Sequence, residues 1–399
     1  MSISIVLGMG NNVDYEIKWD KRVINQMIKD LAIDTQDINK PKRIDTKRDF
    51  LISILYYFTK GIGGEDYVNN PAVLDEFCER FNKKVTLGGT SVRAGIAMSN
   101  IGVSSFNHLV TINEHVERLL PKSSKYLCSN EHNTIYPHVI IQYREGDCVE
   151  IGGKIIQARN SNRIIYVNDP DNSRMKIHED LKLYVKNSKV FLISGLNALK
   201  TKEKLIEKIK ELKKIIANKG EDTLIFCEDA GYHYPGMSEI VGKELFPLAD
   251  IVSMNEDEFQ GYFEEDIDLL NAEDVYNKVL YLKDLYKIKN IVVHTKWWSV
   301  SHTENNLKIY NCMKSGVDLA TTRFVYGDDY DIEDFKKTKE LDRCEAGIDA
   351  VIDFTELNDK NLSCCSVAKV DQNNGTTIGL GDTFVGGFIA ELSTYNQGE

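Results

Sequence analysis

The segment with the clearest chemistry lies near the C-terminus, where a Gly-x-Gly pair precedes an apolar helical stretch. Gly379, Gly381 and Asp382 open this stretch, which runs to about Glu391. A helix that begins there would present free backbone N–H groups and the positive end of its dipole, a combination that binds a phosphate or a developing anion. Asp382 would stand at the mouth of this anion site, where a carboxylate could take the proton of an attacking hydroxyl group. An aspartate N-cap after a glycine turn is an equally good interpretation of the spacing alone.

The second half of the chain supplies the elements that would position this segment. Short β-branched apolar runs alternate there with helices whose apolar residues recur every three or four positions. Strands are expected at 190–196, 223–227, 250–254 and 290–294, and helices at 201–217, 238–245 and 272–286. This alternation predicts an α/β fold with a mainly parallel central sheet and helices on both faces.

The first half of the chain departs from this alternation. Short strands separated by turn residues are expected at 139–143, 154–158 and 163–167. We interpret them as a small β-rich lid inserted into the α/β domain, although two edge hairpins on the main sheet would give the same pattern. The large domain, with the nucleotide and catalytic site, would then comprise residues 1–14, 70–136 and 185–399. The discontinuous lid that covers the substrate would comprise residues 15–69 and 137–184.

The composition is that of an ordinary globular protein and limits the expected partners. The chain has 399 residues, of which 42% are hydrophobic, and 49 Lys and Arg against 61 Asp and Glu give a net charge of −12. Without a dense basic tract, nucleic acid and acidic membrane surfaces are not expected as partners. No apolar run approaches the ~18 residues of a membrane span, and no basic leader region opens the chain, so a cytoplasmic protein is expected. The pattern indicates no particular oligomeric state.

Several blocks of the sequence together resemble one known family. The stretch Gly379-Leu-Gly-Asp-Thr383 resembles the anion-hole motif of the ribokinase-like superfamily, in which the aspartate is the catalytic base. Further blocks narrow the resemblance to the ADP-dependent glucokinase and phosphofructokinase family; they are Leu7-Gly-Met-Gly-Asn-Asn-Val-Asp14, Gly61-Ile-Gly-Gly-Glu65, Leu87-Gly-Gly89, the helix 94–102 and Met254-Asn-Glu-Asp-Glu258. Their order matches the family across nearly the whole chain, which makes the resemblance more specific than any single block.

This resemblance implies a fold, a phosphoryl donor and a metal ion. The fold would be a ribokinase-like large domain capped by a lid, with ADP as donor, AMP as product and Mg2+ as the working ion. Asp382 would be the general base, beside an anion hole formed by Gly379 and Gly381. The residues implied to contact the nucleotide are Asn255, His294, Thr295, Gly379 and Leu380. Glu228 and Glu258 could reach a hydrated Mg2+ at the carboxyl edge of the sheet, or could be solvated loop acids.

The resemblance also places a sugar site in the first half of the chain. The residues implied to bind the acceptor are Asn12, Asp14, Glu65, Gly88, Gly89 and Arg163. Carboxylate and amide groups suit a neutral polyol, and in the family a glutamate at the position of Glu65 accompanies glucose. Arg159, Arg163 and Arg174 could instead hold the phosphate of fructose 6-phosphate, or could be ordinary surface residues. Glucose, fructose 6-phosphate and a kinase that accepts both therefore stay open.

The chain departs from the family pattern in two ways. Phe226 stands where members often carry the histidine of a His-x-Glu motif, and this puts the role of Glu228 in question. The chain is also shorter than expected, and the lid is the expected place of the loss. Two other functions stay open, namely an ATP-dependent ribokinase-like sugar or nucleoside kinase and a sugar-binding protein without catalysis. The intact Asp382 and its two glycines favour an active kinase over the second of these.

Overall fold

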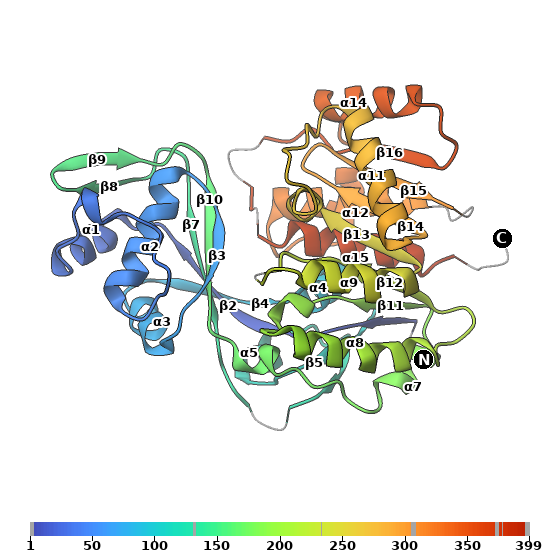
Figure 1. The fold of residues 1–399 in the computed structure, drawn as a ribbon, viewed down its shortest axis with the longest axis horizontal. Coiled ribbons are helices and arrows are strands. Elements are labelled where there is room, and N and C mark those ends of the chain that lie inside the picture. Colours follow the sequence, from blue (N-terminus) through green and yellow to red (C-terminus); the bar gives the residue numbers. More distant parts are fainter. Residues whose placement is uncertain are drawn as a thin grey trace.

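A nine-stranded sheet forms the centre of the larger of two lobes (Figure 1). The computed structural model describes residues 4–130, 133–232, 234–304, 309–371, 375–376 and 378–395. The strand order is β16-β15-β14-β13-β12-β11-β1-β5-β6, and every pair from β14 to β6 is parallel, whereas β15 runs antiparallel to both neighbours. The strand bounds are β1 Ile5–Leu7, β5 Phe106–Leu109, β6 Lys125–Cys128, β11 Val190–Ile193, β12 Leu224–Glu228, β13 Ile251–Asn255, β14 Asn290–His294, β15 Trp298–Thr303 and β16 Leu362–Ser366.

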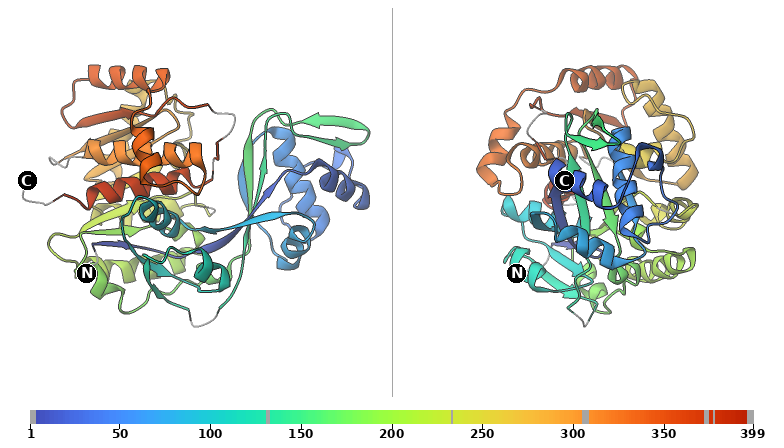
Figure 2. Two further views of the ribbon diagram at one scale, coloured as in Figure 1. Left: turned by 180° about the vertical axis from the view of Figure 1, so that it is seen from behind. Right: turned by 90° about the vertical axis from the view of Figure 1, so that its left-hand side faces the viewer.

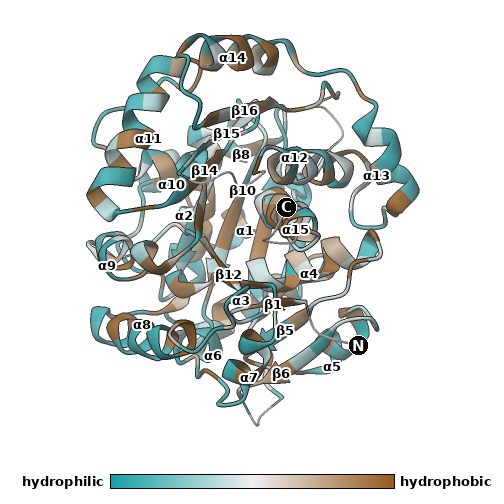
Figure 3. Cartoon of the chain, turned by 90° about the vertical axis from the view of Figure 1, so that its right-hand side faces the viewer, coloured by the Kyte–Doolittle hydropathy of each residue, from teal (hydrophilic) through white to brown (hydrophobic). Residues whose placement is uncertain are grey.

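Alternate residues of these strands enter two different hydrophobic cores, because successive side chains of a strand point to opposite faces of the sheet. Phe191 and Ile193 pack on the face covered by α8, α9, α11 and α14, whereas Val190 and Leu192 pack on the face covered by α4, α12 and α15. Figure 3 accordingly shows hydrophobic colouring on the central strands and mixed colouring on the helices around them. The predicted mainly parallel sheet with helices on both faces is confirmed.

The helices of the large lobe follow the predicted alternation closely in the second half of the chain. The expected helix 201–217 is α8, which begins after Thr201, whose side chain accepts a hydrogen bond from the main-chain N–H of Lys204. The helix bounds are α4 Thr90–Asn100, α5 Glu114–Leu119, α6 Pro170–Ser173, α7 Leu181–Lys186, α8 Lys202–Ile216, α9 Met237–Glu244, α10 Glu256–Gln260, α11 Ala272–Tyr286, α12 Ile309–Tyr326, α13 Ile332–Lys339, α14 Glu345–Glu356 and α15 Leu380–Leu392. None of the described helices is long and apolar enough to cross a membrane.

The smaller lobe is built on a separate five-stranded sheet, ordered β3-β10-β7-β2-β4, with a two-stranded hairpin of β8 and β9 beside it. Helices α1, α2 and α3 cover the side of this sheet that faces away from the large lobe (Figure 1). The lid is therefore its own layer and not a pair of hairpins on the main sheet. The bounds are β2 Asn12–Lys18, β3 Gly64–Tyr67, β4 Lys83–Gly88, β7 His138–Tyr143, β8 Cys148–Ile151, β9 Lys154–Gln157, β10 Asn162–Val167, α1 Lys21–Asp30, α2 Lys47–Lys60 and α3 Pro71–Cys78.

Two elements from the range 70–136, which the sequence assigns to the large domain, pack with the lid sheet. Strand β4 pairs antiparallel with β2 along its whole length, from Lys83 opposite Ile17 to Gly88 opposite Asn12. Helix α3 contributes Phe77 to the hydrophobic core of the small lobe. The lid therefore extends through residue 88, because this pairing joins segments about seventy residues apart, which local sequence patterns do not reveal.

A network of buried polar groups ties the lobes together where β2 and β7 cross between them (Figure 2). These strands pair in parallel, with Asp14 opposite His138. Nε2 of His138 lies 3.3 Å from Oδ2 of Asp169, and Nδ2 of Asn172 donates to the same oxygen at 2.6 Å. Asn172 also donates to the main-chain oxygen of Asn11 at 2.8 Å. The network thus fixes the exit of the first strand toward the small lobe.

Close helix packing fixes α15, the helix that carries the predicted catalytic segment. A Cβ atom at Gly387 would lie 2.6 Å from the main-chain oxygen of Ser315 on α12. We expect Gly387→Ala to destabilise the protein, since overpacking costs about 1 to 3 kcal/mol and exceeds the gain of about 1 kcal/mol in helix propensity. Urea unfolding would measure the loss. Gly231→Ala is the control, because a Cβ there meets no heavy atom within 4 Å; equal stability of both variants would contradict the packing argument.

The ion pair of His138 and Asp169 makes stability depend on pH. Burial opposes the charge on His138, but Asp169 and two further carboxylates raise its pKa above the usual 6.5. A raised pKa contributes stability that is complete below the unfolded-state pKa and is lost as the pH rises through the folded-state pKa. The difference in melting temperature between the wild type and His138→Gln should therefore be larger at about pH 6 than at about pH 9. A difference that stays constant or grows with pH would contradict the ion pair.

Candidate active site

A cavity of about 600 Å³ lies between the two lobes and is lined by both of them. From the small lobe, Arg163, Ile165 and Val167 of β10 line it, whereas Ile164 and Tyr166 between them lie in the core of that lobe. This alternation follows from the period of two in a strand, so one face of the lid sheet forms the roof of the cavity. The volume is typical of a small-molecule site.

The predicted sugar residues gather in this cavity. Asn12, Asp14, Glu65, Gly89 and Arg163 all line it, and Gly88 pairs with Asn12 at the end of β4. Asn12 and Asp14 are almost fully buried, and Nδ2 of Asn12 donates to Oδ1 of Asp14. Neighbouring amide and carboxylate groups on rigid strands can accept from and donate to adjacent hydroxyl groups of a polyol.

The predicted catalytic segment reaches the same cavity from the large lobe. Gly379 and Asp382 line it at the start of α15, and Gly379 has a φ of 68°, a left-handed conformation that favours glycine. The side chain of Asp382 is 22% exposed, so its carboxylate is open to the cavity. The structure therefore brings together a helix N-terminus, a carboxylate and a polar pocket from opposite ends of the chain.

Apart from Gly379, the predicted nucleotide and metal residues do not line this cavity. His294, at the end of β14, has Nε2 3.2 Å from Oε1 of Glu228, and its ring stacks on Phe384 with the centroids 4.3 Å apart. A Cβ atom at Gly381 would lie 3.5 Å from Cε1 of the same histidine. His294 thus connects the first turn of α15, where Leu380 stands, to Glu228 at the end of β12.

Asn255, Glu258 and Thr295 have local structural contacts in addition to any functional role. Oδ1 of Asn255 accepts from the main-chain N–H of Glu258, and Oε2 of Glu258 accepts from that of Asn255, each at 2.9 Å. This capping box begins α10 and explains part of the Asn-x-x-Glu spacing. Oγ1 of Thr295 accepts from the main-chain N–H groups of Trp297 and Trp298 and so shapes the turn from β14 to β15.

Three neighbouring carboxylates, Glu228, Asp229 and Glu258, form what we call the acidic group. Burial raises the pKa of Glu258 well above its usual range, and the charges of Glu228 and Asp229 raise it further. Burial likewise raises the pKa of Asp229 to about 7. Within the described chain, Oε2 of Glu228 and Oδ1 of Asp229 are buried without a hydrogen-bond partner. Incompletely compensated carboxylates of this kind fit a hard divalent cation.

The described residues alone do not complete a metal site, since no three His, Cys, Asp or Glu side chains among them are arranged to hold an ion. This is compatible with Mg2+, which keeps several waters and is usually held by one or two carboxylates together with substrate phosphates. Phe226, which replaces the expected histidine, packs against Phe388 in the core, with the ring centroids 5.1 Å apart. His294 supplies an imidazole to Glu228 from another strand.

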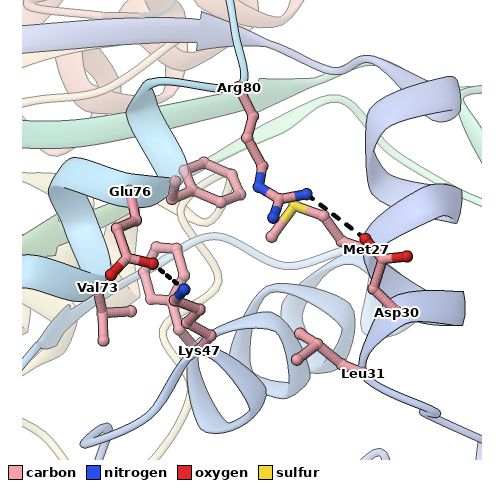
Figure 4. Close-up of a pocket in the computed structure, with 9 residues that line it drawn as sticks. Met27, Asp30, Leu31, Lys47, Val73, Glu76 and Arg80 are labelled. Atoms are coloured by element: carbon pink, nitrogen blue, oxygen red, sulfur yellow. Dashed lines mark ion pairs between the residues drawn. The ribbon is translucent and has the colours of Figure 1, made fainter.

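Of the three arginines considered for a sugar phosphate, Arg163 alone reaches the cavity among the described residues. Arg174 lines a different cavity, beside α8, and Arg159 is exposed outside both. Lys40 and Lys200 line the main cavity as well, although the sequence pattern did not single them out. Another small cavity, of about 40 Å³ among α1, α2 and α3 (Figure 4), has room for little more than water.

Arg93 is the most prominent residue that the sequence pattern missed. Its guanidinium group is almost fully buried at the cavity wall, where Nη2 donates to Oδ2 of Asp14 at 2.6 Å and Nε lies 3.8 Å from Oδ2 of Asp382. An arginine directly before the predicted apolar helix 94–102 was the available signal, because a buried arginine requires anionic partners. Its partners could not be identified from the sequence.

Comparison with known proteins agrees with this architecture. A phosphofructokinase from Pyrococcus horikoshii OT3, solved with AMP, is 21% identical, with 98% of each chain covered and a TM-score of 0.77. An ADP-dependent kinase, solved with fructose-6-phosphate and ADPβS, is 15% identical, with 99% of this chain and 95% of that chain covered and a TM-score of 0.79. The family model of the conserved region of ADP-specific phosphofructokinase/glucokinase matches residues 3–389. By this match over nearly its whole length, the chain belongs to the ADP-specific phosphofructokinase/glucokinase family.

Proposed function

We propose that this member of an ADP-dependent sugar kinase family transfers the β-phosphoryl group of ADP to a hydroxyl group of glucose, of fructose 6-phosphate or of both. The observation that carries the proposal is the single cavity that joins Asp382 and Gly379 to Asn12, Asp14 and Glu65. A polar pocket for hydroxyl groups and an anion-binding helix N-terminus are the two halves that such a transfer requires. The products are AMP and a sugar phosphate.

In the proposed reaction, a hydroxyl oxygen of the acceptor forms a bond to the β-phosphorus while the bond from that phosphorus to the bridging oxygen breaks. Asp382 accepts the hydroxyl proton as the oxygen attacks. The backbone N–H groups from Gly379 to Gly381 donate to the transferred group, and the dipole of α15 adds to their effect. The lid sheet covers the acceptor and limits access of water, which would otherwise compete as the acceptor.

The acidic group supports Mg2+ as the cofactor. Glu228 and Glu258 are the residues that would hold it, and their partly uncompensated buried charge fits a divalent cation better than water alone. When bound, Mg2+ would neutralise phosphate charge of the nucleotide. The position of His294 between Glu228 and Gly381 places this region next to the proposed anion hole.

Two sets of residues bear on the choice of acceptor. Glu65, at the roof of the cavity, suits the hydroxyl groups of glucose. Lys40, Arg163 and Lys200 line the same cavity and would attract the phosphate of fructose 6-phosphate. Both acceptors therefore have chemical support, and the proposal includes each of them.

The role of Asp382 is tested by Asp382→Asn. The amide cannot accept the proton, so kcat should fall by about 10²-fold or more, in line with the loss of a general base. Binding of ADP and of the acceptor, measured by calorimetry, should stay nearly unchanged because the side-chain shape is preserved. A variant that kept most of its turnover would show that another group accepts the proton.

The donor and acceptor are tested together by measuring AMP and ADP release with Mg2+. ADP and ATP are each combined with glucose and with fructose 6-phosphate. We expect AMP only when ADP and at least one acceptor are both present, and no turnover after the divalent cation is chelated with EDTA. Turnover with ATP but not with ADP would overturn the donor assignment. No turnover in any combination would contradict the proposed kinase.

A further inference from the structure

We propose that Arg93 is a positioning residue for phosphoryl transfer. It fixes the carboxylate of Asp14 and orients that of Asp382, so that the acceptor site and the base keep a constant position relative to each other. The inference rests on the function proposed above. Arg93 lies on α4, in the large lobe, and its guanidinium group meets carboxylates from both lobes. Arg93 therefore links the acceptor site to the base.

The contact with Asp14 is a tight one. Nη2 of Arg93 donates to Oδ2 of Asp14 at 2.6 Å, which is short even for a charge-assisted bond, while Oδ1 accepts from Asn12. Both oxygens of Asp14 thus have fixed donors, and both groups of the ion pair are about 5% exposed. A carboxylate held in this way has one orientation toward the cavity, which is the property needed to place an acceptor hydroxyl group.

The contact with Asp382 is looser. Nε of Arg93 lies 3.8 Å from Oδ2 of Asp382, beyond the ~3.2 Å limit of an ordinary hydrogen bond. The positive charge is close enough to hold the carboxylate on its side of the cavity without occupying the oxygen that must accept a proton. A tight bond to Asp382 would reduce its capacity as a base, so the difference between the two contacts suits the different tasks of the two aspartates.

Strands of the small lobe hold the guanidinium group in place. Oε1 of Glu16 on β2 lies 3.6 Å from Nη2 of Arg93 and accepts a hydrogen bond at 2.7 Å from Oγ1 of Thr86 on β4. On the other side, Nη1 would lie 2.7 Å from a Cβ atom at position 379, so the group packs directly against Gly379. Arg93 thereby contacts the acceptor strands, the base and the first residue of the anion hole at once.

The test compares Arg93→Met and Arg93→Lys with the wild type. Arg93→Met should lower kcat by about 10²-fold, the scale expected for a misplaced reacting group, with the KM for ADP nearly unchanged. Arg93→Lys keeps the charge, but its ammonium group lacks the planar array of donors that contacts two carboxylates at once. It should therefore recover about a tenth of the wild-type kcat. If Arg93→Met does not fold, the lysine variant carries the comparison by itself.

A matched control separates positioning from stability. Arg343→Met also removes an arginine from a buried carboxylate, since Nη1 of Arg343 lies 2.7 Å from Oδ1 of the fully buried Asp318, but neither residue lines the cavity. It should lower the melting temperature and leave kcat unchanged. In addition, Arg93→Lys should cost little further kcat in an Asp382→Asn background, because the two residues act as a unit.

The outcomes distinguish this inference from the proposed function. A wild-type protein that forms no AMP with either acceptor would overturn both. An active wild type whose two Arg93 variants keep kcat within about threefold, or lose activity only in proportion to folded protein, would overturn the role of Arg93 alone. Additive losses in the double variant would also overturn it. The expected result is that Arg93→Met loses kcat at a nearly constant KM for ADP and that Arg93→Lys restores part of the kcat.

Discussion

The gathering of buried carboxylates around the cleft is the constraint on which the rest of this structure depends. The carboxyl ends of the parallel strands place the acidic group at one edge of the sheet, and the first turn of α15 brings Asp382 toward the same edge. On the proposed acceptor side, Arg93 compensates the charges of Asp14 and Asp382. In the acidic group the compensation is incomplete, since the described residues leave Oε2 of Glu228 and Oδ1 of Asp229 without a hydrogen-bond partner, and such carboxylates attract a cation. Buried negative charge is therefore balanced by an arginine on one side of the cleft and only partly balanced on the other.

The fold of the second half could be predicted from the sequence because its signals are local. The helix 272–286 and the strand 290–294 were predicted with the bounds that the structure has, since the helix has a clear period and the strand is a short, continuous β-branched run. Helix α2 was not predicted, because Phe50, Leu51, Ile52, Ser53, Ile54 and Leu55 are all buried and leave no polar stripe to reveal a helical period. The sequence placed β4 in the large domain for a different reason, namely that its partner β2 lies far away in the chain.

The same distinction applies to the site. Gly379 and Asp382 could be found because the glycine turn and the carboxylate occupy one short segment, and both residues line the cavity. Arg93 and His138 could not be assigned, because each derives its significance from carboxylates on other elements. The surroundings of Glu228 also depend on a residue from another element. The sequence shows the loss of one histidine, whereas only the fold shows that His294 lies against Glu228.

The strict alternation along β10 gives neighbouring residues two separate tasks. Arg163, Ile165 and Val167 face the cavity, whereas Ile164 and Tyr166 hold the small lobe together. Substitutions at the first set can alter which molecule is accepted without disturbing the packing that the second set maintains. Because the proposed phosphoryl-transfer segment belongs to another lobe with its own cores, such substitutions do not disturb its packing. The roof of the cavity can thus be re-cut for a different acceptor without redesign of the segment proposed to transfer the phosphoryl group.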